Sequence, residues 1–180
     1  LEDVQKVLID CTALFVEPTS TKHQAVQRGN LPINLVVNKR EGVDAVIKNI
    51  GVENFDTSIN VTLGNNQNIT LDKTIQVAND KPISQPYWLV YPLKGGAFDV
   101  RDQTLIGKAW NDPSFQASFT INVDGEDFTI KRPVQYRYID PVKGDTYQPI
   151  PLLPKIELKY DKDNYISLNG QQTTSNLLVK

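Results

Sequence analysis

A strict alternation of apolar and polar residues marks the segment Phe115–Val123, and it constrains the fold more than any other feature. All five odd-numbered positions are apolar and all four even-numbered positions are polar. Successive side chains of a strand point to opposite faces, so this segment predicts a β-strand with one face buried and the other in solvent. Asp124 and Gly125 follow, and this dipeptide favours a type I′ turn. We therefore expect a hairpin whose return strand includes Phe128–Ile130.

The return strand meets a proline, Pro133, and continues as Val134–Tyr138. Proline has no N–H to donate to a neighbouring strand. We therefore expect the strand to bend, to bulge or to lie at a sheet edge there.

The same period of two recurs from Leu31 onward, in short runs rich in β-branched residues. These runs are 31–37, 46–52, 59–63 and 69–77. The segment from Pro82 to Pro113 is rich in proline and breaks the pattern, with short strands expected at Trp88–Tyr91 and Leu105–Lys108. A long connection of this kind suits a Greek key. The sequence thus predicts an all-β, immunoglobulin-like β-sandwich.

The two ends of the chain follow different patterns. Apolar residues spaced by three and four from Leu1 to Phe15 predict a short N-terminal helix, with Cys11 buried on its apolar face, leading into a strand around Leu14–Glu17. The proline-rich segment Asp140–Pro154 predicts a stiff connector.

We therefore place the sandwich and its helical lead-in at residues 1–153. Residues 154–180 would form either extra strands or the start of a following β module, through strands at Ile156–Tyr160 and Tyr165–Leu168. Because the sequence starts at Leu1 and contains no methionine, we expect a piece of a larger protein.

Composition excludes several classes of protein. With 180 residues, 39% of them hydrophobic, and a net charge of −2, the chain can bury a sizeable core and does not resemble a disordered protein. A charge so near zero argues against a nucleic-acid partner. The sequence has no apolar run of the roughly 20 residues that a membrane-spanning helix needs, so we expect no membrane span.

Residues able to carry out catalysis are scarce. His23 is the only histidine, and it lies in a polar stretch where nothing identifies a partner for general-base chemistry. Asp161, Asp163 and Asn164 could offer oxygens to calcium but are also ordinary turn residues. We predict no catalytic residue, no metal ligand and no cofactor.

Aromatic residues offer the one candidate binding site. Trp88 and Tyr91 lie in the proline-rich segment, and Trp110 follows near its end. Exposed tryptophan and tyrosine rings on a β-sandwich can stack on sugar rings, so these three residues are candidate carbohydrate-binding residues. A tryptophan inside an apolar Tyr-Trp-Leu-Val run can equally pack in the core, and both interpretations remain open.

Five segments occur in one order along the chain: 85–89, 102–107, 115–123, 132–136 and 140–149. This order resembles the non-catalytic β-sandwich region of bacterial LmbE-like (PIG-L) N-acetylglucosaminyl deacetylases, and the resemblance covers most of residues 1–155. The catalytic domain of that family uses a zinc site opened by a His-Pro-Asp-Asp motif. This sequence lacks the motif, since His23 is followed by Gln and Ala.

The resemblance implies a non-catalytic accessory module of a periplasmic or extracellular enzyme. The module would act as a spacer or packing partner for the catalytic deacetylase domain of the same parent chain. The alternative is a carbohydrate-binding module with a glycan as its partner.

Overall fold

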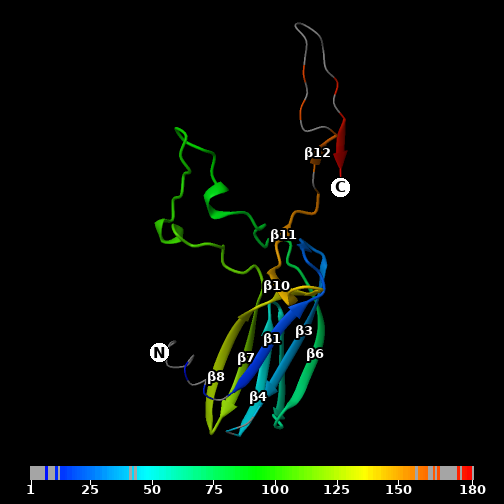
Figure 1. Cartoon of the computed structure of the whole chain (residues 1–180), viewed down its shortest axis with the longest axis vertical. Helices are drawn as coiled ribbons and strands as arrows, with labels where there is room; N and C mark the ends of the chain where they lie inside the picture. Colours follow the sequence, from blue (N-terminus) through cyan, green and yellow to red (C-terminus); the bar gives the residue numbers. More distant parts are fainter. Residues whose placement is uncertain are drawn as a thin grey trace.

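The structure, a computed structural model, describes residues 7, 11, 13–40, 42, 44–156, 158–161, 164, 166, 174 and 176–179. Its elements are strands and two short 3₁₀ turns (Figure 1). In chain order they are β1 (Leu14–Ser20), β2 (Ala25–Val26), β3 (Asn30–Lys39), β4 (Ala45–Val52), β5 (Phe55–Thr62), β6 (Gln67–Gln76), η1 (Tyr87–Leu89), η2 (Gln103–Leu105), β7 (Gln116–Val123), β8 (Glu126–Pro133), β9 (Gln135–Asp140), β10 (Gly144–Pro149), β11 (Leu152–Leu153), β12 (Leu158–Tyr160) and β13 (Leu177–Val179).

Two sheets form the body of the molecule. One has the order β10-β9-β1-β3-β6 and the other the order β5-β4-β7-β8. In Figure 1, β1, β3 and β6 lie in front of the strands of the second sheet. Strands β1, β3 and β6 take the places of A, B and E of an immunoglobulin domain, and β5, β4, β7 and β8 those of C′, C, F and G. The predicted all-β, immunoglobulin-like sandwich is confirmed.

The core lies between the two sheets and follows the alternation of the strands. Every second residue of β3, from Leu31 to Val37, is buried, and so is every second residue of β7 from Ala117 to Val123. In β4 the buried positions change phase after Ile47, because a bulge shifts the register between Ile47 and Asn49. The bulge returns Ile50 to the core, which a strict period of two would have turned outward.

The predicted hairpin of β7 and β8 is confirmed. Asp124 and Gly125 form its turn with φ angles of 51° and 92°, as a type I′ turn requires. Strand β8 lies at the edge of its sheet, and Pro133 is the last residue of the strand.

After Pro133 the chain changes sheets. Val134 alone separates β8 from β9, and β9 pairs in parallel with β1 in the other sheet. The N–H of Val134 donates to the carbonyl of Phe115 at 2.9 Å. The expected bend at an edge is therefore confirmed, and it closes one side of the sandwich.

The connector predicted at Asp140–Pro154 is wrong. Strands β9 and β10 form an antiparallel hairpin, with Gly144 paired to Asp140. The carboxylate of Asp140 accepts hydrogen bonds from the N–H groups of Val142 and Lys143 at 2.8 and 2.9 Å, and these bonds hold the turn. Because β10 lies at the sheet edge, its proline does not interrupt a ladder.

The short strands predicted within the proline-rich segment are also wrong. Residues 87–89 and 103–105 form the 3₁₀ turns η1 and η2 instead. Local contacts favour these turns: Pro86 precedes η1, and the Asp102 side chain accepts from the N–H of Thr104 at 3.0 Å to cap η2. The segment from 77 to 115, here called the crossover, joins β6 of one sheet to β7 of the other, as expected. In Figure 1 it extends beyond the end of the sandwich.

The predictions for the two ends lie partly outside the described residues. Most of the helix predicted at Leu1–Phe15 lies outside them, and Cys11, which we expected to be buried, is exposed because it precedes the first core strand. Most of the strand predicted at 165–168 also lies outside them. Strand β12 pairs with β13 in a separate two-stranded sheet, which extends away from the sandwich in Figure 1. The domain boundary after residue 153 stays a prediction.

Candidate functional site

A cavity of about 490 Å³ lies where the crossover meets the segment between β10 and β11. Its walls are mainly apolar, and Ile150, which is buried in the sandwich core, also lines it. Two tryptophans and four prolines are among the lining residues: Trp88, Trp110, Pro86, Pro113, Pro149 and Pro151. We call it the crossover cavity.

The structure brings together two of the three predicted carbohydrate-binding residues. Trp88 and Trp110 both line the crossover cavity, and Trp110 is 77% exposed. Trp88 is half-buried and packs edge-on against Tyr87, with 4.9 Å between the ring centroids. Neither tryptophan belongs to the sandwich core, so the core-packing interpretation is wrong for both.

Tyr91 lies apart from this pair. It does not line the crossover cavity, and the guanidinium carbon of Arg101 lies 3.8 Å from the centroid of its ring. This cation–π contact covers one face of the ring. Tyr91 therefore does not share the crossover cavity with the two tryptophans, and its role in carbohydrate binding stays a prediction.

Polar groups in the crossover cavity hold the crossover in place. The Ser84 hydroxyl lies 2.7 Å from that of Ser114 and accepts from the N–H of Leu152 at 2.8 Å. The Asn111 amide accepts from the N–H of Tyr87 at 3.2 Å and donates to the carbonyl of Gln85. Because these groups already have partners within the chain, the surface left to a ligand is largely apolar.

Trp88 also lines a second hollow, of about 390 Å³, together with Phe98, Val100 and Ile106. Several large hydrophobic side chains of the crossover are exposed: Ile83, Leu89, Val90, Leu93, Phe98, Ile106 and Trp110. The crossover therefore presents apolar surface well beyond the crossover cavity. Isolated apolar residues are normal at a surface, whereas apolar residues grouped together mark a contact site, and Phe98 and Ile106 are grouped in the second hollow.

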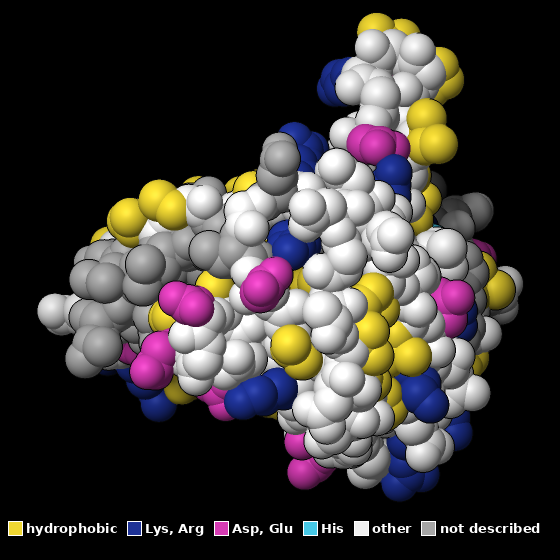
Figure 2. All heavy atoms as spheres, turned by 90° about the horizontal axis from the view of Figure 1, so that it is seen from below, with side chains coloured by type: hydrophobic (Ala, Val, Ile, Leu, Met, Phe, Trp, Pro, Cys, Tyr) yellow, Lys and Arg dark blue, Asp and Glu magenta, His cyan; other side chains and the backbone are white. Residues whose placement is uncertain are grey.

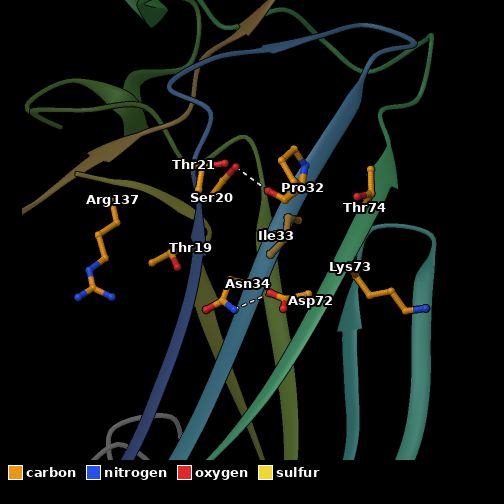
Figure 3. Close-up of a pocket in the computed structure, with 10 residues that line it drawn as sticks. All are labelled: Thr19, Ser20, Thr21, Pro32, Ile33, Asn34, Asp72, Lys73, Thr74 and Arg137. Carbon is orange, nitrogen blue, oxygen red and sulfur yellow. Dashed lines mark hydrogen bonds between the residues drawn. The ribbon is translucent and has the colours of Figure 1, made fainter. Parts of the chain in front are cut away.

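A second site, which the sequence did not indicate, lies on the outer face of the five-stranded sheet (Figure 3). It has a volume of about 530 Å³, and we call it the polar hollow because eight of its ten lining residues are polar or charged. Thr19 of β1, Asn34 of β3 and Asp72 of β6 lie side by side in it, because the strand register pairs Thr19 with Asn34 and Asn34 with Asp72. The Asn34 amide donates to the Asp72 carboxylate at 2.6 Å.

Arg137 of β9 lines the same hollow and carries a compensated charge. Its guanidinium donates to Asp145 at 2.9 Å and to Glu17 at 3.5 Å. The hydrogen bond to Asp145 raises the pKa of Arg137, and the charge of Glu17 adds to this effect. Tyr147 donates to Glu17 at 2.6 Å, and this bond, with burial, raises the pKa of the Tyr147 phenol.

Other groups with potential chemistry lie apart. His23 packs edge-on against Tyr136, with 6.0 Å between ring centroids. Within the described part of the chain, no three His, Cys, Asp or Glu residues lie close enough to hold a metal ion. Acidic and basic side chains are interspersed over the face in Figure 2. Among the described residues, no helix has both the length and the apolar character needed to cross a membrane.

Comparisons with models of protein families, with curated proteins and with solved structures found no match for this chain. The resemblance to the LmbE-like deacetylases therefore stays a prediction from the sequence. What the molecule offers to a functional argument is its own geometry: a largely apolar crossover cavity at one end of the sandwich and a polar hollow on the outer face of one sheet.

Proposed function

We propose that this chain is a non-catalytic accessory β-sandwich that packs against a neighbouring protein domain through its crossover. The exposed apolar side chains gathered on the crossover are the observation that carries the proposal. A long loop that presents apolar surface usually has a binding role, because its exposure to water is otherwise unfavourable. The sequence resemblance points to the catalytic domain of a periplasmic or extracellular LmbE-like deacetylase as the neighbour.

The chemistry of the crossover cavity favours packing against protein. Ser84, Ser114 and Asn111 bond within the chain, and the walls of the cavity are mainly apolar. Apolar side chains of a partner can fill such a space without leaving polar groups unpaired. Complete burial of one exposed residue such as Phe98 or Ile106, each somewhat more than half exposed, would stabilise the complex by about 1–2 kcal/mol.

The coding sequence beside residues 1–180 provides the first test. We expect it to encode a domain with a His-Pro-Asp-Asp motif, and the separately expressed domain should bind this chain in a calorimetric titration. Absence of such a domain, or absence of binding, would contradict the proposed partner.

Substitutions in the crossover provide the second test. The double variant Phe98→Ser, Ile106→Ser should weaken that binding at least tenfold, because both side chains lie in the exposed apolar surface. The matched control is Val142→Ser, since Val142 is 92% exposed but lies in the turn between β9 and β10. Equal affinities for both variants would show that the partner binds elsewhere.

A carbohydrate-binding module is the second candidate function, favoured because Trp88 and Trp110 line one cavity and Trp110 is widely exposed. Titration with chitin or peptidoglycan fragments should then change the tryptophan fluorescence, and Trp110→Ala should abolish the change. Tyr91→Ala is the control, because Tyr91 lies in the crossover but outside the crossover cavity. Fluorescence that stays constant with every fragment would remove this candidate.

A further inference from the structure

We propose that the polar hollow on the outer face of the five-stranded sheet binds a neutral, polyhydroxylated ligand, namely an oligosaccharide chain. This inference does not depend on the crossover cavity, which lies at the end of the sandwich and is lined by other residues. It rests on the row of polar side chains in Figure 3, on their hydrogen-bonding capacity and on the balance of charge around them.

The row is built by the sheet itself. Thr19, Asn34 and Asp72 occupy neighbouring outward positions on three adjacent strands. Adjacent strands lie about 4.8 Å apart, so the row spans roughly 10 Å across the sheet. Side chains on paired strands are positioned before a ligand arrives, and binding therefore orders little of the protein. A volume of about 530 Å³ is ample for a ligand of several rings.

The row keeps both donors and acceptors that have no partner among the residues that the structure describes. The Asn34 amide gives one of its two N–H groups to Asp72, which leaves the other N–H and the amide oxygen. The second carboxylate oxygen of Asp72 remains an acceptor. Within the described part of the chain, the structure shows no hydrogen bond from the hydroxyl groups of Thr21 and Thr74, which are exposed and line the hollow, whereas Thr19 is buried. A sugar hydroxyl both donates and accepts, and so matches this mixed set.

The charges around the hollow favour a neutral ligand over an anion. Two cationic residues line the hollow, Arg137 and Lys73, and Arg137 is held between Asp145 and Glu17. Lys73 points away from the row in Figure 3, and its ammonium lies 5.0 Å from the centroid of the Phe55 ring. Asp72 adds a negative charge within the row itself. A phosphate or sulfate would therefore meet a carboxylate without a free guanidinium to compensate.

The test is an NMR titration of the full 180-residue chain, ¹⁵N-labelled, with three neutral probes: chitohexaose, cellohexaose and maltohexaose. We expect at least one of them to shift the amide signals of residues 19–21, 33–34 and 72–74 in a saturable manner. Inorganic phosphate should cause no comparable shift. Absence of a saturable shift with all three hexasaccharides, or tighter binding of phosphate, would overturn the proposal.

Two matched variants then locate the site. Asn34→Ala should weaken sugar binding at least tenfold. Asn38→Ala should leave it unchanged, because Asn38 makes an equivalent bond of 2.6 Å to Asn68 on the same two strands but outside the hollow. Both variants lose one cross-strand hydrogen bond, so thermal melting should show similar stability. Equal loss of binding in both would overturn the proposal.

Trp110→Ala separates this site from the second candidate function. If the sugar binds the polar hollow, this variant binds as the wild type does. If Trp110→Ala abolishes binding and Asn34→Ala does not, the sugar binds the crossover cavity and the polar hollow is not the site.

Discussion

The phenol of Tyr147 donates a hydrogen bond of 2.6 Å to Oε1 of Glu17, a residue 130 positions earlier in the chain. The two residues belong to β10 and β1, and β9 lies between these strands in the sheet. Arg137 of β9 contacts the same carboxylate, with 3.5 Å between its Nη1 and Oε2 of Glu17. This group of side chains ties the edge strand of the sheet to the first strand of the chain.

Removing the phenol oxygen should weaken this link. We expect Tyr147→Phe to lower the free energy of unfolding by about 0.5–1.5 kcal/mol, because one hydrogen bond is lost while the ring remains. Tyr147 is 40% exposed and water competes for the bond, so the effect should fall in the lower half of that range. Urea unfolding measures the change. Tyr160→Phe, on the exposed strand β12, serves as the control and should leave stability nearly unchanged.

The same bond should make the effect of Tyr147→Phe depend on pH. The hydrogen bond to Glu17 raises the pKa of Tyr147 in the folded protein. Because the pKa of the phenol is higher in the folded protein, the bond contributes stability at any pH below the pKa of the unfolded protein, about 10. This contribution is lost as the pH rises through the pKa of the folded protein. The stability difference between wild type and Tyr147→Phe should therefore shrink above about pH 10. A difference that grows with pH in thermal melts would contradict the assignment.

Acid should weaken a second link, between Lys48 and Asp127. The Lys48 ammonium lies 2.6 and 2.8 Å from the two oxygens of Asp127. This contact, followed by the hydrogen bond from Asn122, lowers the pKa of Asp127. The resulting stability is present above the pKa of Asp127 in the unfolded protein, about 3.9, and is lost as the pH falls through its pKa in the folded protein.

Asp127→Asn should therefore destabilise the protein near neutral pH, and its difference from wild type should vanish in strong acid. Thermal melts across the acidic range measure this convergence. The exposed Asp80 provides a control, since Asp80→Asn, a surface substitution, should change stability little. Parallel curves for wild type and Asp127→Asn would show that the link contributes nothing.

Gly125 should be difficult to replace in the β7–β8 turn. Its φ angle of 92° lies in a region that residues with a Cβ adopt only under strain. We expect Gly125→Ala to lower the free energy of unfolding by about 1–2 kcal/mol. Asp124→Asn should be nearly neutral, because Asn tolerates the left-handed conformation that Asp124 adopts with φ 51°. Similar losses for the two variants would argue against a backbone origin.

Alanine substitution of two phenylalanines should show that the core contributes to stability and that the crossover does not. Phe119 is fully buried between the sheets, whereas Phe98 is exposed on the crossover. Phe119→Ala should lower the free energy of unfolding by about 3–5 kcal/mol, and Phe98→Ala by no more than about 0.5 kcal/mol. If Phe119→Ala does not fold, Phe119→Leu should show a smaller loss. Comparable losses for Phe98 and Phe119 would mean that the crossover belongs to the core.

Prediction from the sequence succeeded where the structure depends on residues that are close together in the chain. The alternation of Phe115–Val123 identified a strand and its buried face, and Asp124-Gly125 identified the turn that follows. It failed at residues 144–149, where prolines and glycine suggested a connector but the chain forms β10. A proline at a sheet edge leaves no missing hydrogen bond, and only the sheet order shows that β10 is an edge.

The candidate sites divide in the same way. Trp88 and Trp110 could be named from the sequence because tryptophan in a proline-rich loop is conspicuous, but their shared cavity could not. Thr19, Asn34 and Asp72 carried no signal, since each is an ordinary polar residue on the outer side of a strand. Their alignment depends on the pairing of β1 with β3 and of β3 with β6.

By itself, the sequence determined which residues of β3 and β7 face the core, because the direction of a side chain depends on its position in a repeat of two residues. The tertiary structure alone decided which strands are neighbours, where the chain changes sheets at Val134, and which distant residues share a surface. These features depend on contacts between segments far apart in the chain, and their free energies are set by the packing of the whole sandwich rather than by any local pattern.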